Sequence, residues 1–166
     1  MRVLILGSGS FAGQAVFSSL LRKDINVIGI NRSKPKGSFY WEWLKEYSDN
    51  KFQWITCNLY KEPQKMKALI KDISPTHIID FMGQGMVSQS WEDPRLWFQT
   101  NISEKSFLLE EIRKINNLKK YIRISTPEVY GSSFNPLDES ANFNPSTPYA
   151  ISHAAIDQYI RCIGKN

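Results

Sequence analysis

The sequence has few cysteines and no long apolar run. Its two cysteines, Cys57 and Cys162, lie far apart and show no metal-ligand spacing, which excludes a disulfide-stapled scaffold. Both are expected to be buried free thiols. The apolar run Val3–Leu6 stops at Gly7, far short of the ~20 residues that span a bilayer and of the ~7–15 in a secretory signal. We therefore expect a cytoplasmic protein that does not bind membranes.

Low-complexity segments and internal repeats are also absent, which excludes a disordered or solenoid protein. The chain has 166 residues, of which 42% are hydrophobic and 22% charged, so residues 1–166 are expected to form one domain with its own core. The net charge is +5, but lysine and arginine are spread along the chain instead of clustered. This distribution favours a surface that attracts anionic cofactors over a nucleic-acid partner.

Short apolar runs alternate with segments of helical periodicity, a pattern typical of a parallel α/β sheet. The expected strands are Val3–Leu6, Asn26–Ile30, Phe52–Thr56, His77–Phe81 and Tyr121–Ser125. Helices are expected from Ala12 to Leu20, Pro63 to Ile73, Pro94 to Ile115, and from Pro148 onward. The pattern predicts a doubly wound Rossmann fold with strand order 3-2-1-4-5 and a ligand crevice at the carboxyl ends of strands 1 and 4.

One segment departs from this alternation. The aromatic stretch Phe39–Leu44 lies between the second and third expected strands and predicts a helix. It would cover part of the core or meet a partner. The alternative is that one of its rings stacks on adenine.

A glycine-rich loop follows the first strand and opens the first helix. Its spacing satisfies the G-x-G-x-x-G/A pattern that binds dinucleotides. Such a loop lets the backbone approach a pyrophosphate, while the helix directs its N–H groups and positive dipole end at that anion. The expected cofactor-binding residues of the loop are Gly7, Gly9, Ser10, Phe11, Ala12 and Gly13.

The end of the second strand bears on the choice of cofactor. A site that prefers NAD has an acidic residue there for the ribose 2′-hydroxyl, but this chain has Asn31, Arg32 and Ser33. A guanidinium binds a 2′-phosphate well, so NADP is expected, with NAD possible. The alternative is that Arg32 is an ordinary solvated loop residue.

From Gly7 onward the chain resembles the extended short-chain dehydrogenase/reductase family, in particular its nucleotide-sugar epimerases and dehydratases. Ser10 replaces the middle glycine of the family's G-x-x-G-x-x-G pattern. Five further segments match family motifs: Asn58-Leu59, Phe81–Gln84, Asp93-Pro94 with Thr100-Asn101, Ser125–Gly131 and Pro148–Ala155. The resemblance adds as cofactor-binding residues Asn58, Leu59, Phe81, Met82, Gly83, Gln84, Asn101, Tyr149 and His153.

The resemblance also implies the chemistry. Tyr149 matches the family tyrosine that takes the proton of the sugar 4-hydroxyl while hydride passes to the nicotinamide, and Thr126 matches its hydroxyl partner. Glu128 stands where the 4,6-dehydratases have the base that removes the C5 proton, which favours a dehydratase (a lyase) over an epimerase (an isomerase). Pro127 occupies the position of a proton-donating aspartate of one dehydratase branch, so Glu128 or water would have to replace it. A strand continuing this far would place Thr126 and Glu128 on one side. Glu128 as an ordinary exposed carboxylate is the alternative.

His153 departs from the family's Tyr-x-x-x-Lys pattern. The family lysine lies one helical turn after the tyrosine, and a unit charge ~4 Å away stabilises a phenolate by up to about 4 kcal/mol at an effective dielectric of ~20. A histidine with a pKa of ~6.5 offers less charge, so Tyr149 is expected to be a weaker base than its family counterpart. His153 is then a working substitute, a mark of lost catalysis, or a change tolerated in a fragment. The first alternative predicts that His153→Lys raises turnover at neutral pH.

The family's enzymes are roughly twice as long as this chain. The last helix is expected to expose an apolar face formed by Ile156, Tyr159, Ile160 and Ile163. Either the chain is the first half of a longer enzyme, or a second chain, such as its partner in a homodimer, covers this face. The leading interpretation is the cofactor-binding and catalytic half of an NADP-dependent enzyme acting on a nucleotide-sugar, and the alternative is a non-catalytic NAD(P)-binding module.

Overall fold

The computed structural model describes residues 1–33, 52–139 and 142–164. The expectation for Phe39–Leu44 therefore falls outside the described residues. Two compact units are present: Met1–Met82 with Glu110–Ile124, and Gly83–Leu109 with Ser125–Asn166. Each is described by itself below.

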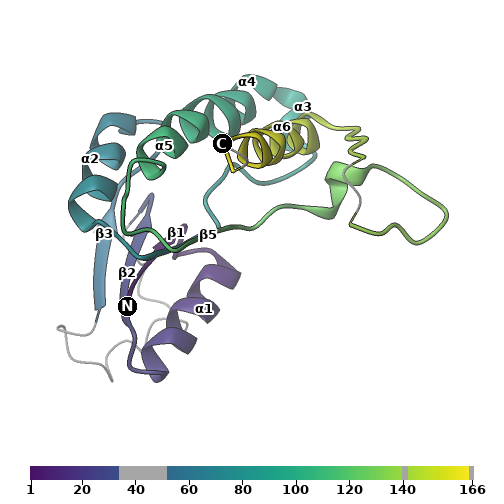
Figure 1. The fold of residues 1–166 in the computed structure, drawn as a ribbon. Helices are drawn as coiled ribbons and strands as arrows, with labels where there is room; N and C mark the ends of the chain where they lie inside the picture. Colours follow the sequence, from purple (N-terminus) through teal and green to yellow (C-terminus); the bar gives the residue numbers. More distant parts are fainter. Residues whose placement is uncertain (34–51, 140–141, 165–166) are drawn as a thin grey trace. The chain divides into compact units, whose positions relative to one another are not determined.

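The first unit contains a parallel sheet of five strands (Figure 1). The strands are β1 (Arg2–Leu6), β2 (Asn26–Asn31), β3 (Phe52–Thr56), β4 (His77–Asp80) and β5 (Lys120–Arg123). Their order is β3-β2-β1-β4-β5 and every pairing is parallel, which confirms the predicted topology. The bounds of β3 are those predicted, and the bounds of the other strands differ from the predicted ones by at most two residues.

Helices α1 (Phe11–Arg22) and α2 (Pro63–Ile73) lie on opposite sides of this sheet (Figure 1). This agrees with the strand order, because the chain moves in one direction from β1 to β2 and in the other from β3 to β4, and crossovers between parallel strands are almost always right-handed. Phe17 of α1 is fully buried and packs edge-on against Phe52 and Trp54, with ring centroids 6.0 and 5.7 Å away. These aromatic contacts fix α1 on the sheet.

The second unit is helical. It contains α3 (Gln89–Glu92), α4 (Pro94–Phe98), the π-helical segment η2 (Gln99–Glu104), the 3₁₀ turn η3 (Pro127–Tyr130) and α6 (Pro148–Ile163), and α5 (Lys105–Ile112) continues from η2. The single regular helix expected from Pro94 to Ile115 is therefore wrong in two respects, because a π turn interrupts it and it ends at Ile112. No helix among the described residues is both long and apolar enough to cross a membrane.

Three smaller expectations are corrected. Strand β5 ends at Arg123, so Thr126 and Glu128 belong to the N-terminus of η3 and strand alternation does not place them. Ile156 is fully buried instead of exposed on the last helix. Of the two free thiols, Cys57 is buried as expected but Cys162 is exposed.

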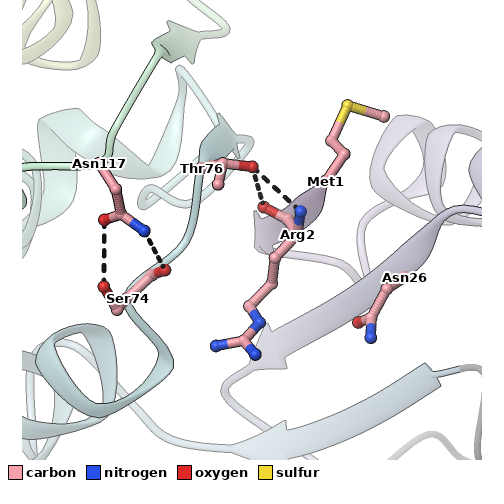
Figure 2. A pocket seen from close by; sticks show the side chains of 6 residues that line it. All are labelled: Met1, Arg2, Asn26, Ser74, Thr76 and Asn117. Atoms are coloured by element: carbon pink, nitrogen blue, oxygen red, sulfur yellow. Dashed lines mark hydrogen bonds between the residues drawn. The ribbon is translucent and has the colours of Figure 1, made fainter.

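The amino-terminal edge of the sheet carries an open pocket, which Figure 2 shows. Arg2 lies in it, and its Nη1 donates to the Ile73 carbonyl oxygen at 2.7 Å, which satisfies the end of α2. Thr76 Oγ1 accepts from the Arg2 N–H and donates to the Arg2 carbonyl, both at 3.0 Å. This pocket lies at the edge opposite to the predicted ligand crevice, and its polar groups already serve the fold.

Candidate functional site

The loop after β1 turns at Gly7, whose φ is +73°. The Gly7 N–H donates to the Ile30 carbonyl at 2.8 Å, and the Gly7 carbonyl accepts from the Ser10 N–H at 3.0 Å. A Cβ at Gly7 would lie only 2.9 Å from the Phe81 carbonyl carbon and the Met82 nitrogen. Glycine is therefore required here for both conformation and space, and it brings the carboxyl ends of β1 and β4 together.

Helix α1 presents open amide groups at its N-terminus. Ser10 is its N-cap, and Ser10 Oγ accepts from the Gly13 N–H at 3.1 Å. Among the described residues, no acceptor pairs with the N–H groups of Gly9, Phe11 and Ala12. Three unpaired amides at the positive end of a helix form a binding site for an anion. The loop therefore fits the pyrophosphate of a dinucleotide.

The end of β2 lies against this loop. A Cβ at Gly9 would come within 2.3 Å of Asn31 Nδ2, so the second glycine makes room for the asparagine side chain. Asn31 Nδ2 donates to the Ser33 carbonyl at 3.2 Å. Arg32 and Ser33 are exposed. Of the three residues predicted to select the cofactor, Asn31 thus lies beside the loop, and Arg32 and Ser33 follow it at the surface.

The side chain of Asn58 stabilises a turn of the backbone. Its Oδ1 accepts from the N–H groups of Tyr60 at 3.0 Å and Lys61 at 3.2 Å, which stabilises the turn after β3. Leu59 is buried, with 4% of its surface exposed. These contacts explain both residues without a cofactor, and their predicted contact with adenine stays a prediction.

In the second unit, Asn101 connects two segments of the predicted site. Its Oδ1 accepts from the Gln84 N–H at 2.7 Å, and its Nδ2 donates at 3.0 Å both to the Gln84 carbonyl and to Ser152 Oγ. Only 1% of Asn101 is exposed, and Gly83 approaches so closely that a Cβ there would lie 3.2 Å from Asn101 Oδ1. Asn101 therefore connects the segment around Gln84 to helix α6. It lies in the π-helical segment η2, and such local irregularities are frequent at functional sites.

Helix α6 carries the candidate catalytic tyrosine in its first turn. Thr147 is its N-cap, with Oγ1 accepting from the Ala150 N–H at 3.0 Å, and the Tyr149 N–H donates to Ser90 Oγ at 3.2 Å. The rings of Tyr149 and His153 lie 4.5 Å apart between centroids. Tyr149 is half-buried, whereas His153 is buried with 8% exposed. The structure therefore brings the two residues into direct contact on one face of the helix.

Turn η3 packs against α6. Thr126 is the N-cap of η3, and its Oγ1 accepts a long hydrogen bond of 3.4 Å from the Glu128 N–H. Both residues are half-buried. Ser125 Oγ donates to Asp157 Oδ2 of α6, which ties the start of this segment to the helix. Thr126 and Glu128 thus lie on an element that contacts the helix of Tyr149 and His153.

Sequence reasoning missed four polar residues of this region. Ser90 and Ser152 are fully buried, and their hydroxyls bind the first turns of α6. Ser125 and Asp157 form the tie between η3 and α6. Asp157 could have been found from its position four residues after His153, which places both on one face of a helix. Nothing in the sequence marks the three serines.

Comparison with known proteins identifies the chain's relatives. The sequence model of the family described as GDP-mannose 4,6 dehydratase matches residues 4–166. The chain belongs to this family of nucleotide-sugar dehydratases and epimerases. Among curated relatives it is 30% identical to the UDP-glucose 4-epimerase of Yersinia enterocolitica and 25% identical to the dTDP-glucose 4,6-dehydratase of Salmonella typhimurium (strain LT2), with 97% of this chain matched in both.

The chain spans about half the length of these relatives, 48% of the epimerase and 50% of the dehydratase. Solved structures give the same proportion. The UDP-glucuronic acid 4-epimerase of Bacillus cereus, solved with UDP-glucuronic acid and NAD, has a TM-score of 0.84 at 25% identity and matches 100% of this chain with 53% of its own. The UDP-Glc/GlcNAc 4-epimerase of Campylobacter jejuni has a TM-score of 0.86 at 21% identity, over 99% of this chain and 49% of its own, which shows a shared fold.

Proposed function

We propose that this member of the family is the cofactor-binding and catalytic half of an NADP-dependent nucleotide-sugar 4,6-dehydratase. The observation that carries the proposal is the contact between η3 and α6, because it brings the segment of Thr126 and Glu128 to the helix that carries Tyr149 and His153. A dehydratase needs one group to deprotonate the sugar 4-hydroxyl and another to remove the C5 proton.

Each group has a role in this proposal. The unpaired amides of the glycine loop hold the cofactor, which when bound supplies a hydride acceptor for C4 of the sugar. Tyr149 accepts the proton of the 4-hydroxyl, and Thr126, whose hydroxyl can donate as well as accept, hydrogen-bonds the same sugar oxygen. Glu128 removes the proton at C5. Because Pro127 has no proton to give, Glu128 or water would protonate the hydroxide that leaves C6. Formation of the 4-keto-6-deoxy sugar would then need the hydride taken from C4 to be returned to C6 and a proton to be returned to C5.

A 4-epimerase is the second candidate. It needs Tyr149 and Thr126 but no base at C5, and the epimerases among the relatives favour it. The products separate the two candidates. The full gene product incubated with a panel of nucleotide-sugars should form a 4-keto-6-deoxy sugar. Mass spectrometry would detect it as a product about 18 Da lighter than the substrate, the mass of one water. A 4-epimer of unchanged mass would reject the dehydratase proposal.

Glu128→Gln gives a sharper test of the same point. The amide keeps the size of the side chain but cannot remove a proton. In a dehydratase this variant should lose at least about 100-fold in product formation, while exchange of hydride between cofactor and C4 persists. Full retention of product formation would show that Glu128 is not the base.

NADP is proposed as the cofactor because Arg32 is exposed and directly follows Asn31, whose side chain lies beside the loop. NAD is the alternative cofactor, since the epimerases of Bacillus cereus and Thermus thermophilus were solved in complex with NAD. Calorimetry should show tighter binding of NADPH than of NADH. Arg32→Ala should weaken NADPH about tenfold and leave NADH unchanged, because only NADPH carries the 2′-phosphate. Equal loss for both cofactors would contradict this role of Arg32.

We also propose that this protein meets a partner through its second unit. Trp91 of α3, Phe98 of α4 and Ile151 of α6 are 64%, 37% and 43% exposed, which is unusual for such large apolar side chains. A second copy of the chain would cover them in a homodimer. Light scattering of the purified chain tests this, and Trp91→Glu should convert a dimer to a monomer. A monomeric wild-type chain would contradict the homodimer, and further residues of a longer protein would then be the alternative cover for these side chains.

Finally, the proposal includes a cytoplasmic location. Its support is the pair of free thiols, Cys57 and Cys162, which is typical of a reducing compartment. Fractionation of the source cells would test it.

A further inference from the structure

Three titratable side chains follow one another along α6. Tyr149, His153 and Asp157 are spaced by four residues, so they share one face of the helix. Side chains of a helix lean toward its N-terminus, and each therefore covers the turn before its own. The 4.5 Å between the rings of Tyr149 and His153 shows this for the first pair. Asp157 lies one helical turn after His153 on the same face.

Ser125 holds the carboxylate of Asp157 from outside the helix. Its hydroxyl donates to Asp157 Oδ2. A carboxylate has two oxygens and about four lone-pair positions, so one hydrogen bond does not exhaust its capacity as an acceptor. Asp157 is half-buried and His153 is buried, which reduces the screening of charge between them by water.

We propose that Asp157 is a positioning residue that keeps His153 protonated at neutral pH. The imidazolium then gives Tyr149 the neighbouring positive charge that the family obtains from lysine. This inference rests on the proposed function, because it explains how Tyr149 acts as a base. Burial alone would favour the neutral ring of His153, and a neighbouring carboxylate opposes that effect. The proposal therefore explains how a buried histidine at this position can carry a charge.

Other charged groups lie on α6 itself, where Arg161 is about two turns after His153, and on the elements packed against it. Lys105, the C-cap of η2, is buried with 1% exposed, and a positive charge on an element packed against α6 would favour the neutral ring. The remaining titratable groups of the elements packed against α6 are Glu92 and Arg95 on α3 and α4, Glu104 on η2, and Glu128 and Tyr130 on η3. All of them are the same in a wild-type chain and in an Asp157 variant, so comparing the two isolates the carboxylate.

The test is an NMR titration of the histidine rings. The chain has only two histidines, His77 and His153, so the spectrum holds two sets of ring signals, and His153→Gln assigns them. In Asp157→Asn the pKa of His153 should fall by about one unit, because an opposite charge is removed. Asp157→Glu should restore most of the loss. The His77 signals should titrate identically in all variants.

Ser125→Ala is the matched control. It breaks the hydrogen bond to Asp157 but keeps the carboxylate charge, whereas Asp157→Asn removes the charge but keeps an oxygen that Ser125 can bind. The pKa of His153 should therefore follow the charge and change little in Ser125→Ala. An unchanged pKa in Asp157→Asn, or an equal fall in both variants, would overturn the proposal.

This measurement needs no substrate or cofactor, so it can fail while the proposed function stands, and the reverse also holds. It further refines the expectation for His153→Lys. If Asp157 keeps the histidine protonated at neutral pH, the lysine adds little charge there. The gain in turnover should then appear above the pKa of His153, where only lysine stays charged.

Discussion

Replacement of Asn101 by alanine tests the arrangement of the second unit. Asn101 is 1% exposed and makes three hydrogen bonds, of 2.7, 3.0 and 3.0 Å, to Gln84 and Ser152. Each bond contributes about 0.5–1.5 kcal/mol net. Gln84 is half-buried and water can reach part of it, while Ser152 Oγ keeps its 2.7 Å bond to the Tyr149 carbonyl. The expected cost of Asn101→Ala is therefore about 2–4 kcal/mol of unfolding free energy.

Urea unfolding followed by circular dichroism measures this loss. With a slope of about 2 kcal/mol per molar urea, the midpoint should fall by about 1–2 M. The control is Asn117→Ala in the first unit. Asn117 also makes two side-chain hydrogen bonds, both with Ser74, at 3.1 and 3.3 Å (Figure 2). Unlike Asn101, it is exposed. Its loss should be below about 1 kcal/mol. Equal losses in the two variants would refute the idea that Asn101 is the structural link.

Three further predictions concern single residues. Gly7→Ala should cost about 2–4 kcal/mol, because its φ is +73° and a Cβ would meet backbone, whereas Gly85→Ala should be neutral since nothing lies within 4 Å; urea midpoints decide. Thr147→Ala should cost about 1 kcal/mol by removing the N-cap of α6, measured as a fall in melting temperature, and no fall would deny the cap. Burial raises the pKa of the Cys57 thiol, so iodoacetamide at neutral pH should add one group to the folded chain, at Cys162, and two groups after denaturation. Modification of native Cys57 would contradict its burial.

The sheet was predictable because its signals are local. Apolar runs ending in glycine or polar residues mark buried parallel strands, and right-handed crossovers leave few possible strand orders. The glycine loop was predictable for the same reason, since Gly7 must have a positive φ and Gly13 must allow close packing, with its Cβ position 2.5 Å from the Gly7 carbonyl oxygen. Both requirements are met by glycine and can therefore be recognised in the sequence.

The catalytic region was less predictable because tertiary contacts decide it. Nothing between Pro94 and Ile115 marks a π turn in the sequence, and the structure has one around Asn101, whose side chain bonds to segments distant in the chain. The turn η3 begins at Pro127, and the hydroxyl of Thr126 caps it instead of continuing the strand. A proline after a threonine was a usable signal for a helix start that the strand interpretation passed over.

The proposed function depends most on the glycine loop as the binding site for a dinucleotide. A ¹⁵N NMR titration of the 19.2 kDa chain with NADPH tests this directly, because it reports which amides meet the ligand. The largest shifts should come from the unpaired N–H groups of Gly9, Phe11 and Ala12 at the start of α1. Shifts confined to the amino-terminal edge around Arg2, or no shifts at millimolar NADPH and NADH, would contradict the account.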